Sequence, residues 1–216
     1  NNTVYTVTIT TNVSDTAGNQ LESEYPWQFT TATQYDIALY TAGGGWNLVS
    51  LPIIPNDENI STVLGDAEGN IEAVWTYDPS HPNAVDGWLA YIPGDPDGTN
   101  NLDTMTAGYG YWISVNGNVN ISGAGNLLTA GPNLPPSRDL SAGWNLVGYY
   151  QIPGESSSNP GSAFSSLGGT YTGLWGFNNQ TGNFMSTVNE ILPGDAFWIS
   201  LPSAKTYTPS NVNNAT

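Results

Sequence analysis

The chain has no cysteine among its 216 residues. Disulfide bonds, thiolate zinc sites, iron–sulfur clusters and cysteine nucleophiles are therefore excluded. The sequence also lacks a run of about 18 consecutive apolar residues, which is the length that a transmembrane helix needs. We therefore expect no membrane span and no thiol chemistry.

Positive charge is almost absent. Arg138 and Lys205 are the two basic residues against 18 acidic ones, and the formal net charge is −16. Nucleic acid is excluded as a partner, because no cluster of Lys and Arg can replace the counterions on its phosphates. An anionic membrane surface is disfavoured for the same reason. An acidic surface attracts cations, which makes Ca²⁺ the candidate cofactor, although a soluble, self-repelling surface explains the same charge.

Histidine is scarce as well. His81, between Ser80 and Pro82, is the one histidine of the chain. A Ser-His-Asp arrangement can be drawn with Asp86, but no nucleophile elbow or glycine-rich oxyanion motif lies nearby. The 18 acidic residues leave open a carboxylate pair of the kind that hydrolyses glycosides. Most of them, however, lie in turn-like segments. We predict no catalytic residue and expect the chain not to be an enzyme.

Turn-forming and aromatic residues are plentiful. The chain has 25 glycines and 15 prolines, and 12% of its residues are aromatic. This composition favours short strands joined by many turns. Residues 4–10 alternate apolar residues with Thr, and residues 25–31 form a second strand-like run. With turn residues at 15–19 between them, these segments predict a hairpin with a long connection.

The run from Tyr5 to Thr31 resembles the last two strands of the bacterial Ig-like domain of surface-layer and large adhesive proteins. The motif D-x-x-G-N from Asp15 and the motif W-x-F-T-T from Trp27 carry this resemblance. It implies an extracellular, cell-surface protein and a partial Ig-like hairpin over residues 1–33. A two-stranded hairpin alone is marginally stable. We therefore expect that the missing strands come from a longer precursor or from a neighbouring copy, or that the hairpin packs on the next domain.

An internal repeat covers most of the remaining chain. The segment G-W-N-L-V at 45–49 recurs at 143–147, and two later tryptophans recur in the same order, Trp75 with Trp175 and Trp112 with Trp198. Three matched anchors in one order indicate a duplication. The last pair is closer together in sequence than the others, which places an insertion in the first copy around residues 80–103.

Short helices are expected in both copies, at 59–64 and 161–167, because Gly65 and Gly168 suit C-terminal caps. The sequence thus predicts an all-β fold, an Ig-like β-hairpin followed by two tandem β-sandwich or barrel-like repeat modules with short helices. The expected boundaries are 1–33 for the hairpin, 38–130 and 137–209 for the repeats, and 210–216 for a tail, with a Pro-rich linker at 131–136.

The repeat resembles a module that accompanies Ig-like domains in archaeal and bacterial surface proteins. This module begins with G-W-N-L-[IV]-S-L-P and has G-x-x-Y-W-I near its end, as the first copy does here. The resemblance implies a location on the cell surface and no particular chemistry.

The insertion contains the candidate metal site. Oxygen-bearing side chains cluster there in a glycine-containing loop, at Asp95, Asp97, Asn100 and Asp103. Ca²⁺ requires several closely spaced oxygen ligands on a backbone that turns sharply. The pattern departs from an EF-hand, because Pro96 intrudes and no glutamate closes the loop. A surface turn needs the same residue types and is the alternative.

Aromatic residues form a second candidate site. Exposed Trp and Tyr rings stack on sugar rings, so Trp88 and Tyr91, with Tyr149 and Tyr150, are candidates for a carbohydrate platform. The tryptophans matched between the repeats lie in apolar strands and are expected in the core. Trp88 has no evident counterpart in the second copy, which favours it for binding.

We predict a structural function, as a segment of a surface layer, stalk or filament. The partners are then other copies of the chain in a homopolymer, or the rest of a larger surface protein. The assembly strand is expected at the start of the chain, with the apolar residues Val4, Tyr5, Val7 and Ile9, pairing at a neighbour's open sheet edge. The alternative is a carbohydrate-binding or adhesion module of a large exported protein.

Six Asn-x-Ser/Thr sequons mark candidate glycosylation sites in an exported protein. They are Asn1, Asn12, Asn59, Asn120, Asn179 and Asn214.

Overall fold

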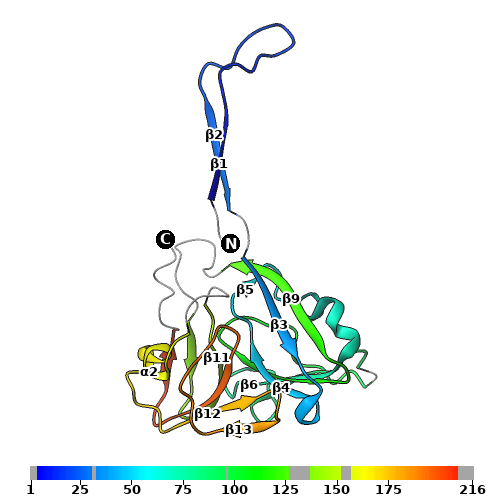
Figure 1. The fold of residues 1–216 in the computed structure, drawn as a ribbon, viewed down its shortest axis with the longest axis vertical. Helices are drawn as coiled ribbons and strands as arrows, with labels where there is room; N and C mark the ends of the chain where they lie inside the picture. Colours follow the sequence, from blue (N-terminus) through cyan, green and yellow to red (C-terminus); the bar gives the residue numbers. More distant parts are fainter. Residues whose placement is uncertain (1–3, 31–32, 96, 127–136, 152–156, 209–216) are drawn as a thin grey trace.

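Antiparallel strands dominate the computed structural model, which describes residues 4–30, 33–95, 97–126, 137–151 and 157–208 (Figure 1). Its helices are short, and no sheet within these ranges closes into a barrel. The all-β class with short helices is therefore confirmed. No helix in the described ranges has the length and apolar character to cross a membrane.

The strands and helices follow the chain in this order. The strands are β1 (Val4–Ile9), β2 (Tyr25–Thr30), β3 (Thr33–Leu39), β4 (Trp46–Ser50), β5 (Ile54–Pro55), β6 (Ile71–Tyr77), β7 (Trp88–Tyr91), β8 (Gly110–Val115), β9 (Val119–Asn126), β10 (Arg138–Leu140), β11 (Gly143–Gly148), β12 (Gly173–Asn178), β13 (Asn183–Met185), β14 (Ala196–Leu201) and β15 (Lys205–Tyr207). The helices are α1 (Ile60–Leu64) and α2 (Pro160–Ala163), with 3-10 turns at η1 (Ala42–Gly44), η2 (Gly65–Asn70) and η3 (Ser165–Leu167).

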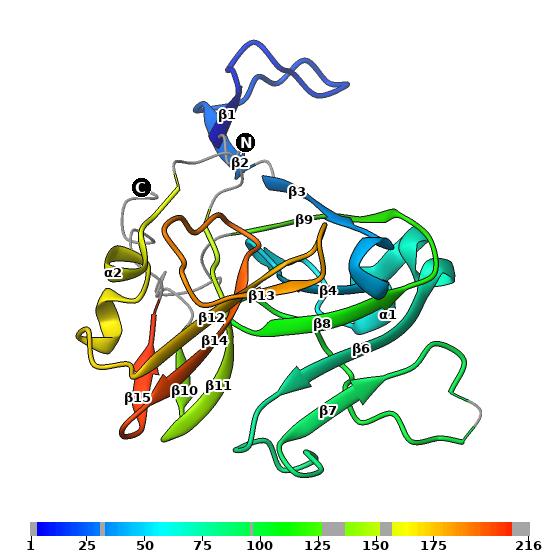
Figure 2. The same ribbon diagram turned by 60° about the horizontal axis from the view of Figure 1, so that its bottom comes forward.

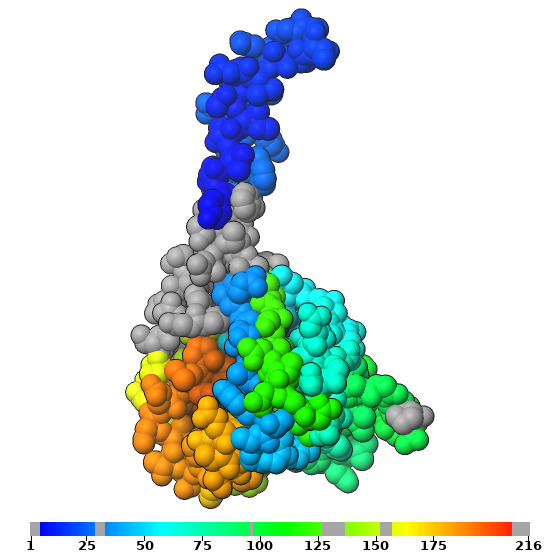
Figure 3. All heavy atoms as spheres, turned by 45° about the vertical axis from the view of Figure 1, so that its right-hand side comes forward, coloured from blue at the N-terminus to red at the C-terminus, as the bar shows by residue number. Residues whose placement is uncertain are grey.

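β1 and β2 form the predicted hairpin, which stands away from the body of the molecule (Figures 1 and 3). The carboxylate of Asp15 holds the connecting turn by accepting two backbone N–H groups at 2.9 Å. The register places Val7 opposite Trp27, so these two residues share one face with Tyr5 and Ile9. All four side chains are at least 37% exposed. The hairpin therefore has an apolar face that the described residues leave uncovered.

Two four-stranded sheets repeat one topology. Their strand orders are β4-β8-β6-β7 and β11-β14-β12-β13, which are equivalent strand by strand. Trp75 pairs with Trp112 in the first sheet, as Trp175 pairs with Trp198 in the second. The internal repeat of the sequence thus corresponds to a repeat in three dimensions. Smaller ladders, β3-β9-β5 and β10-β15, complete the first and second modules (Figure 2).

Each four-stranded sheet covers its own apolar core. The first core joins the sheet to β3, β9 and α1, and the second joins it to α2, η3 and β15. The helix predicted in the first copy is confirmed, because Asn59 caps α1 at its start and Gly65 caps its end. The helix predicted in the second copy is divided into α2 and η3, and η3 ends at Gly168 with a left-handed φ of 66°.

The asparagine of the G-W-N-L-V motif holds the loop that precedes the strand. Asn47 is fully buried, and its Oδ1 accepts the N–H of Tyr40 while its Nδ2 donates to the carbonyls of Tyr40 and Gly45. Asn145 makes the same set of bonds to Ser141 and to Gly143 in the second module. An amide with all its partners inside the fold stabilises the loop and is costly to replace.

An approximate two-fold axis relates the two modules. Val49 forms a backbone bridge with Asp195, and its repeat equivalent, Val147, forms one with Tyr109. Tyr109 and Asp195 are also equivalent positions in the two repeats. Exchanging the two modules therefore turns one bridge into the other. The modules therefore meet as two subunits of a symmetric dimer do, through the same surface on both.

Ser50 and Gly148 meet at this axis. The N–H of Ser50 donates to Gly194 at 2.7 Å, and the N–H of Gly148 donates to Gly108 at 3.1 Å. A Cβ on Gly148 would lie 2.4 Å from the Cβ of Ser50, so only one of the pair can carry a side chain. This close approach explains why the G-W-N-L-V motif is followed by serine in one copy and by glycine in the other.

Candidate functional site

The outward faces of the two sheets carry most of the tryptophans. Along each strand, alternate residues point to opposite faces, so the residues next to these tryptophans enter the cores. Trp46, Trp144 and Trp175 are 38%, 45% and 40% exposed, and the tryptophans at 75, 112 and 198 are half-buried. The expectation that the repeat-matched tryptophans form the core was wrong. They line the surface and the junction of the modules.

The first module has a groove made of four tryptophans. Trp46, Trp75, Trp88 and Trp112 line a shallow space of about 510 Å³. Trp88, a residue predicted to stack on sugars, is part of this lining and contacts Trp75 with ring centroids 6.1 Å apart. These two rings therefore pack edge to face within the groove.

The second module has an equivalent groove of about 580 Å³. Its lining consists of five aromatic side chains, Tyr77, Trp144, Trp175, Phe184 and Trp198. Four of them belong to the second module, and Tyr77 is contributed by the end of β6 in the first. No aliphatic residue of the described chain lines either groove.

The two grooves adjoin through ring contacts that also obey the two-fold relation. Trp88 lies 5.8 Å from Trp198, and Phe184 lies 5.7 Å from Trp112. Trp88 pairs with Tyr77 across β6 and β7, as Phe184 pairs with Phe177 across β12 and β13. Phe184 is thus the counterpart of Trp88 in the second copy, a relation that the sequence concealed because the intervening turn differs in length.

The other tyrosines proposed for a sugar platform lie elsewhere. Tyr149 and Tyr150 are each 1% exposed and belong to the module cores, so they cannot stack on a ligand. Tyr91 lies at the end of β7, outside both groove linings, and its hydroxyl is hydrogen-bonded to Glu68 and to Ser61.

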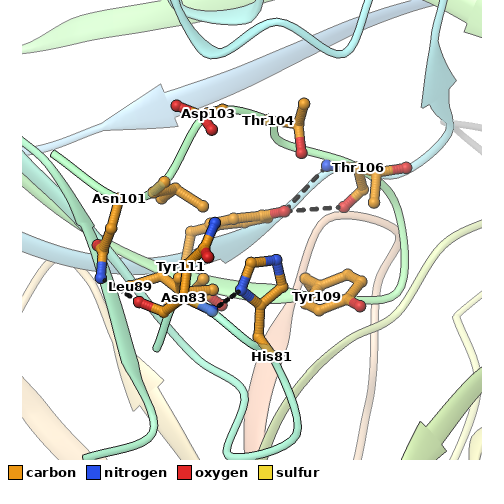
Figure 4. A pocket seen from close by; sticks show the side chains of 11 residues that line it. His81, Asn83, Leu89, Asn101, Asp103, Thr104, Thr106, Tyr109 and Tyr111 are labelled. Carbon is orange, nitrogen blue, oxygen red and sulfur yellow. Dashed lines mark hydrogen bonds between the residues drawn. The ribbon is translucent and has the colours of Figure 1, made fainter. Parts of the chain in front are cut away.

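A polar pocket of about 260 Å³ lies on the opposite face of the first sheet (Figure 4). Thr76, Leu89 and Tyr111, the chain neighbours of three groove tryptophans, form part of its lining. The inserted segments of the first module supply the rest of the lining, with His81, Asn83 and the stretch from Asn101 to Thr104. Burial raises the pKa of the Tyr111 hydroxyl well above its ordinary value, and this hydroxyl accepts the N–H of Thr106 at 2.9 Å.

His81 points into this pocket (Figure 4), and among the described residues it does not form the Ser-His-Asp arrangement drawn from the sequence. Its Nδ1 accepts the backbone N–H of Asn83 at 3.2 Å, and the hydroxyl of Ser80 donates instead to Asp78 at 2.6 Å. Asp86, the acid of the arrangement drawn from the sequence, has no hydrogen bond to the histidine among the described residues. The expectation that the chain is not an enzyme stays a prediction.

The candidate calcium loop is held by its own side chains. The carboxylate of Asp95 accepts the N–H of Asn100 at 2.7 Å, and the amide of Asn100 bonds to both backbone groups of Ile92. The bond from the Asn100 N–H, together with the hydrogen bond from the Thr99 hydroxyl, holds the pKa of Asp95 below its ordinary value. Asp97 is exposed, and Asp103 faces the polar pocket. No group of three acidic or histidine residues that could hold a metal occurs in the described ranges, and calcium binding stays a prediction.

The predicted glycosylation sites differ in their surroundings. Asn12, Asn59 and Asn120 are exposed. Asn179 is half-buried at the junction of the modules, where its side-chain amide bonds to both the N–H and the C=O of Leu48. Asn1 and Asn214 lie outside the described residues, as do the expected tail at 210–216 and linker at 131–136.

The comparisons with known proteins bear on the start of the chain. Residues 1–31 match the family model of the bacterial Ig-like domain, a domain type typical of bacterial surface proteins. The match is confined to the hairpin segment, and it confirms that part of the resemblance. Neither the search of curated proteins nor that of solved structures gives a significant match. The resemblance of the two repeats to a surface-protein module gains no support from these comparisons.

Proposed function

We propose that this chain is a carbohydrate-binding part of an exported surface protein, with the two aromatic grooves as its binding sites. The observation that carries the proposal is the composition of the grooves, which are lined by aromatic rings alone among the described residues. The bacterial Ig-like match of residues 1–31 fits the location.

Rings of this kind suit the apolar faces of sugars. The face of an aromatic ring is negative and attracts the weakly positive C–H groups on one face of a pyranose, and stacking removes both surfaces from water. Ring contacts such as those of Trp46 with Trp112 (6.4 Å) and Tyr77 with Trp88 (5.2 Å) hold the grooves in shape before a ligand arrives. Such preorganisation lowers the entropy cost of binding.

The residues that line the grooves and the net charge of the chain restrict the class of ligand. Sites for apolar peptides commonly rely on flexible aliphatic and methionine side chains, which these grooves do not contain. The net charge of −16 repels anionic polymers. Neutral glycans that expose a flat C–H face therefore fit the grooves best.

A glycan array tests the proposal with the intact chain. We expect selective binding to neutral glycans that persists in 0.5 M NaCl, because stacking is not screened by salt. An array without selective binding would contradict the proposal, and so would binding limited to charged glycans and abolished by salt.

Assembly through the hairpin is a second candidate function, and a different observation favours it. Tyr5, Val7 and Ile9 of the predicted assembly strand are 49%, 37% and 40% exposed, and Trp27 on the same face is 45% exposed. An exposed apolar patch of this kind marks an interaction surface. The partner we propose is a set of Ig-like strands on a neighbouring copy or in the rest of a larger surface protein.

Electron microscopy and analytical ultracentrifugation test this second candidate. We expect native material to form filaments or sheets, and we expect the substitution Val7→Lys with Ile9→Lys to disperse them. The substitution Thr6→Lys with Thr8→Lys places the same charges on the opposite face of β1 and serves as the control. Assemblies that tolerate the first pair as well as the second would contradict this function.

A further inference from the structure

We propose that the polar pocket of the first module is a second binding site, which accepts a single neutral polyhydroxylated ring, such as one sugar unit at a chain end. The inference rests on the proposed function for the class of ligand. It concerns a different site, because the pocket and the first groove lie on opposite faces of the same sheet.

The pocket is an addition to the repeated fold. In the first module, the turn between β6 and β7 supplies His81 and Asn83, and the loop after β7 supplies Asn101, Asp103 and Thr104. The second module has shorter connections at both places. A chain segment that is absent from one copy of a duplicated fold is not needed to form that fold, and loops of this kind commonly carry function.

Some pocket side chains hold the walls. The amide of Asn101 accepts the N–H of Ala90 at 2.6 Å and donates to the carbonyl of Asn83 at 2.8 Å, which ties the two inserted segments together. The hydroxyl of Tyr111 bonds to the backbone of Thr106 (Figure 4). These bonds fix the shape of the pocket before a ligand enters.

Other polar groups of the pocket keep their hydrogen-bonding capacity. The carboxylate of Asp103, the hydroxyl of Thr104 and the Nε2 atom of His81 have no hydrogen-bond partner among the described residues. Two carboxylate oxygens, a hydroxyl and an imidazole nitrogen offer both donors and acceptors, which vicinal hydroxyl groups require. Leu89 and the Tyr111 ring, which are 3% and 1% exposed, form the packed floor beneath these polar groups.

Size and charge restrict the ligand further. A volume of about 260 Å³ is below the range of about 300–1,000 Å³ that is typical of drug-sized ligands. One ring fits such a space, and an oligosaccharide does not. No Lys or Arg lines the pocket, and Asp103 would repel an anion, so a neutral ring is favoured.

Titration of the ¹⁵N-labelled chain with single sugars tests the inference. The probes are glucose, galactose, mannose and N-acetylglucosamine, with glucosamine as a cationic comparison. We expect one neutral sugar to shift the backbone amide signals of Asn83 and Thr104. We also expect His81→Ala and Asp103→Asn each to weaken its binding about tenfold, which is the effect of losing one hydrogen bond to a charged or strongly polar group. Asp97→Asn removes the same charge from the same loop outside the pocket and should change binding less than twofold.

The other outcomes separate the pocket from the grooves. Sugar binding that is weakened by Trp175→Ala and not by the pocket substitutions would place the ligand in a groove, which overturns the inference and leaves the proposed function intact. Binding of glucosamine alone would overturn the neutral class. An absence of shifts with every probe would overturn the site itself, whatever the glycan array shows.

Discussion

Arg138 joins the two modules through backbone carbonyl groups. Its guanidinium donates to Leu146 at 2.6 Å in the second module and to Tyr77 at 3.0 Å in the first. It also lies 3.8 Å from the ring centroid of Tyr109 and 3.9 Å from the carboxylate of Asp78. Burial lowers the pKa of this guanidinium, and the nearby Tyr109 and Asp78 oppose that effect. In a chain with two basic residues, one is thus used inside the molecule.

Replacing Arg138 with lysine should lower the free energy of unfolding by about 2–4 kcal/mol, because a lysine cannot reach both carbonyls and leaves a buried acceptor unpaired. Urea denaturation followed by tryptophan fluorescence measures the change. The matched control is Lys205→Met, which removes the other cation. Lys205 makes one hydrogen bond, to Leu167 at 3.1 Å, at a half-buried site. Equal losses in the two variants would contradict the role assigned to Arg138.

Asp195 should make the stability of the folded chain depend on pH. Burial, with the negative charge of Glu190, raises the pKa of this carboxyl above its ordinary value of about 3.9. The folded state therefore binds more protons than the unfolded state between the two pKa values, and stability falls as the pH rises through that window. Asp195→Asn keeps an acceptor for the N–H of Leu192 and removes the charge.

The measurement for Asp195 is the difference in melting temperature between Asp195→Asn and the unchanged chain from pH 3 to pH 8. We expect a small difference at pH 3 that grows in favour of the variant and becomes constant above the folded pKa. A difference that is independent of pH would show that the carboxyl titrates alike in both states.

The tryptophans show what a sequence pattern can and cannot decide at the level of residues. Alternation correctly separates Trp46 and Leu48 from Asn47 and Val49 on opposite faces of β4. It does not say which face is the core, because both faces carry apolar residues. Leu48 is buried against the other module, and the groove tryptophans adjoin this junction. A pattern within one strand contains no information about that second covered face.

The β1–β2 hairpin is the element most independent of the rest. Its described side chains are exposed and its register is internal. Deleting residues 1–30 should therefore change the melting temperature of the remaining chain by less than about 2 °C, since little apolar surface is buried against the body. Differential scanning calorimetry measures this. A loss of several degrees would mean that the hairpin packs on the modules in solution.

Elements and their order were largely predictable, and the sites were not. The hairpin, the first helix with its glycine cap, and the duplicated strands follow from alternation, capping residues and repetition. The grooves and the pocket depend on tertiary geometry. Tyr77 completes a groove of the other module, and His81 and Thr104 line one pocket only because two inserted segments fold over one sheet end.

On the scale of the whole molecule, the two modules should unfold as one cooperative unit. They share a third apolar cluster around Leu48, Leu146 and Ala196, and they exchange the paired backbone contacts at the two-fold axis. Neither module can lose these contacts without exposing apolar surface of the other. Urea transitions followed by fluorescence and by far-ultraviolet circular dichroism should coincide. Two separated transitions would show that the modules are independent.

The central claim is that the aromatic grooves bind glycans. The most direct measurement is the affinity for the neutral polysaccharide with the strongest array signal, compared among the unchanged chain, Trp46→Ala, Trp144→Ala and the double variant. Trp27→Ala, whose ring is 45% exposed like that of Trp144, is the control outside the grooves. We predict that each single groove variant weakens binding about tenfold, or about 1.4 kcal/mol, because one stacking ring is lost. The double variant should abolish binding, and Trp27→Ala should have no effect. A folded double variant that binds as tightly as the unchanged chain would contradict the account.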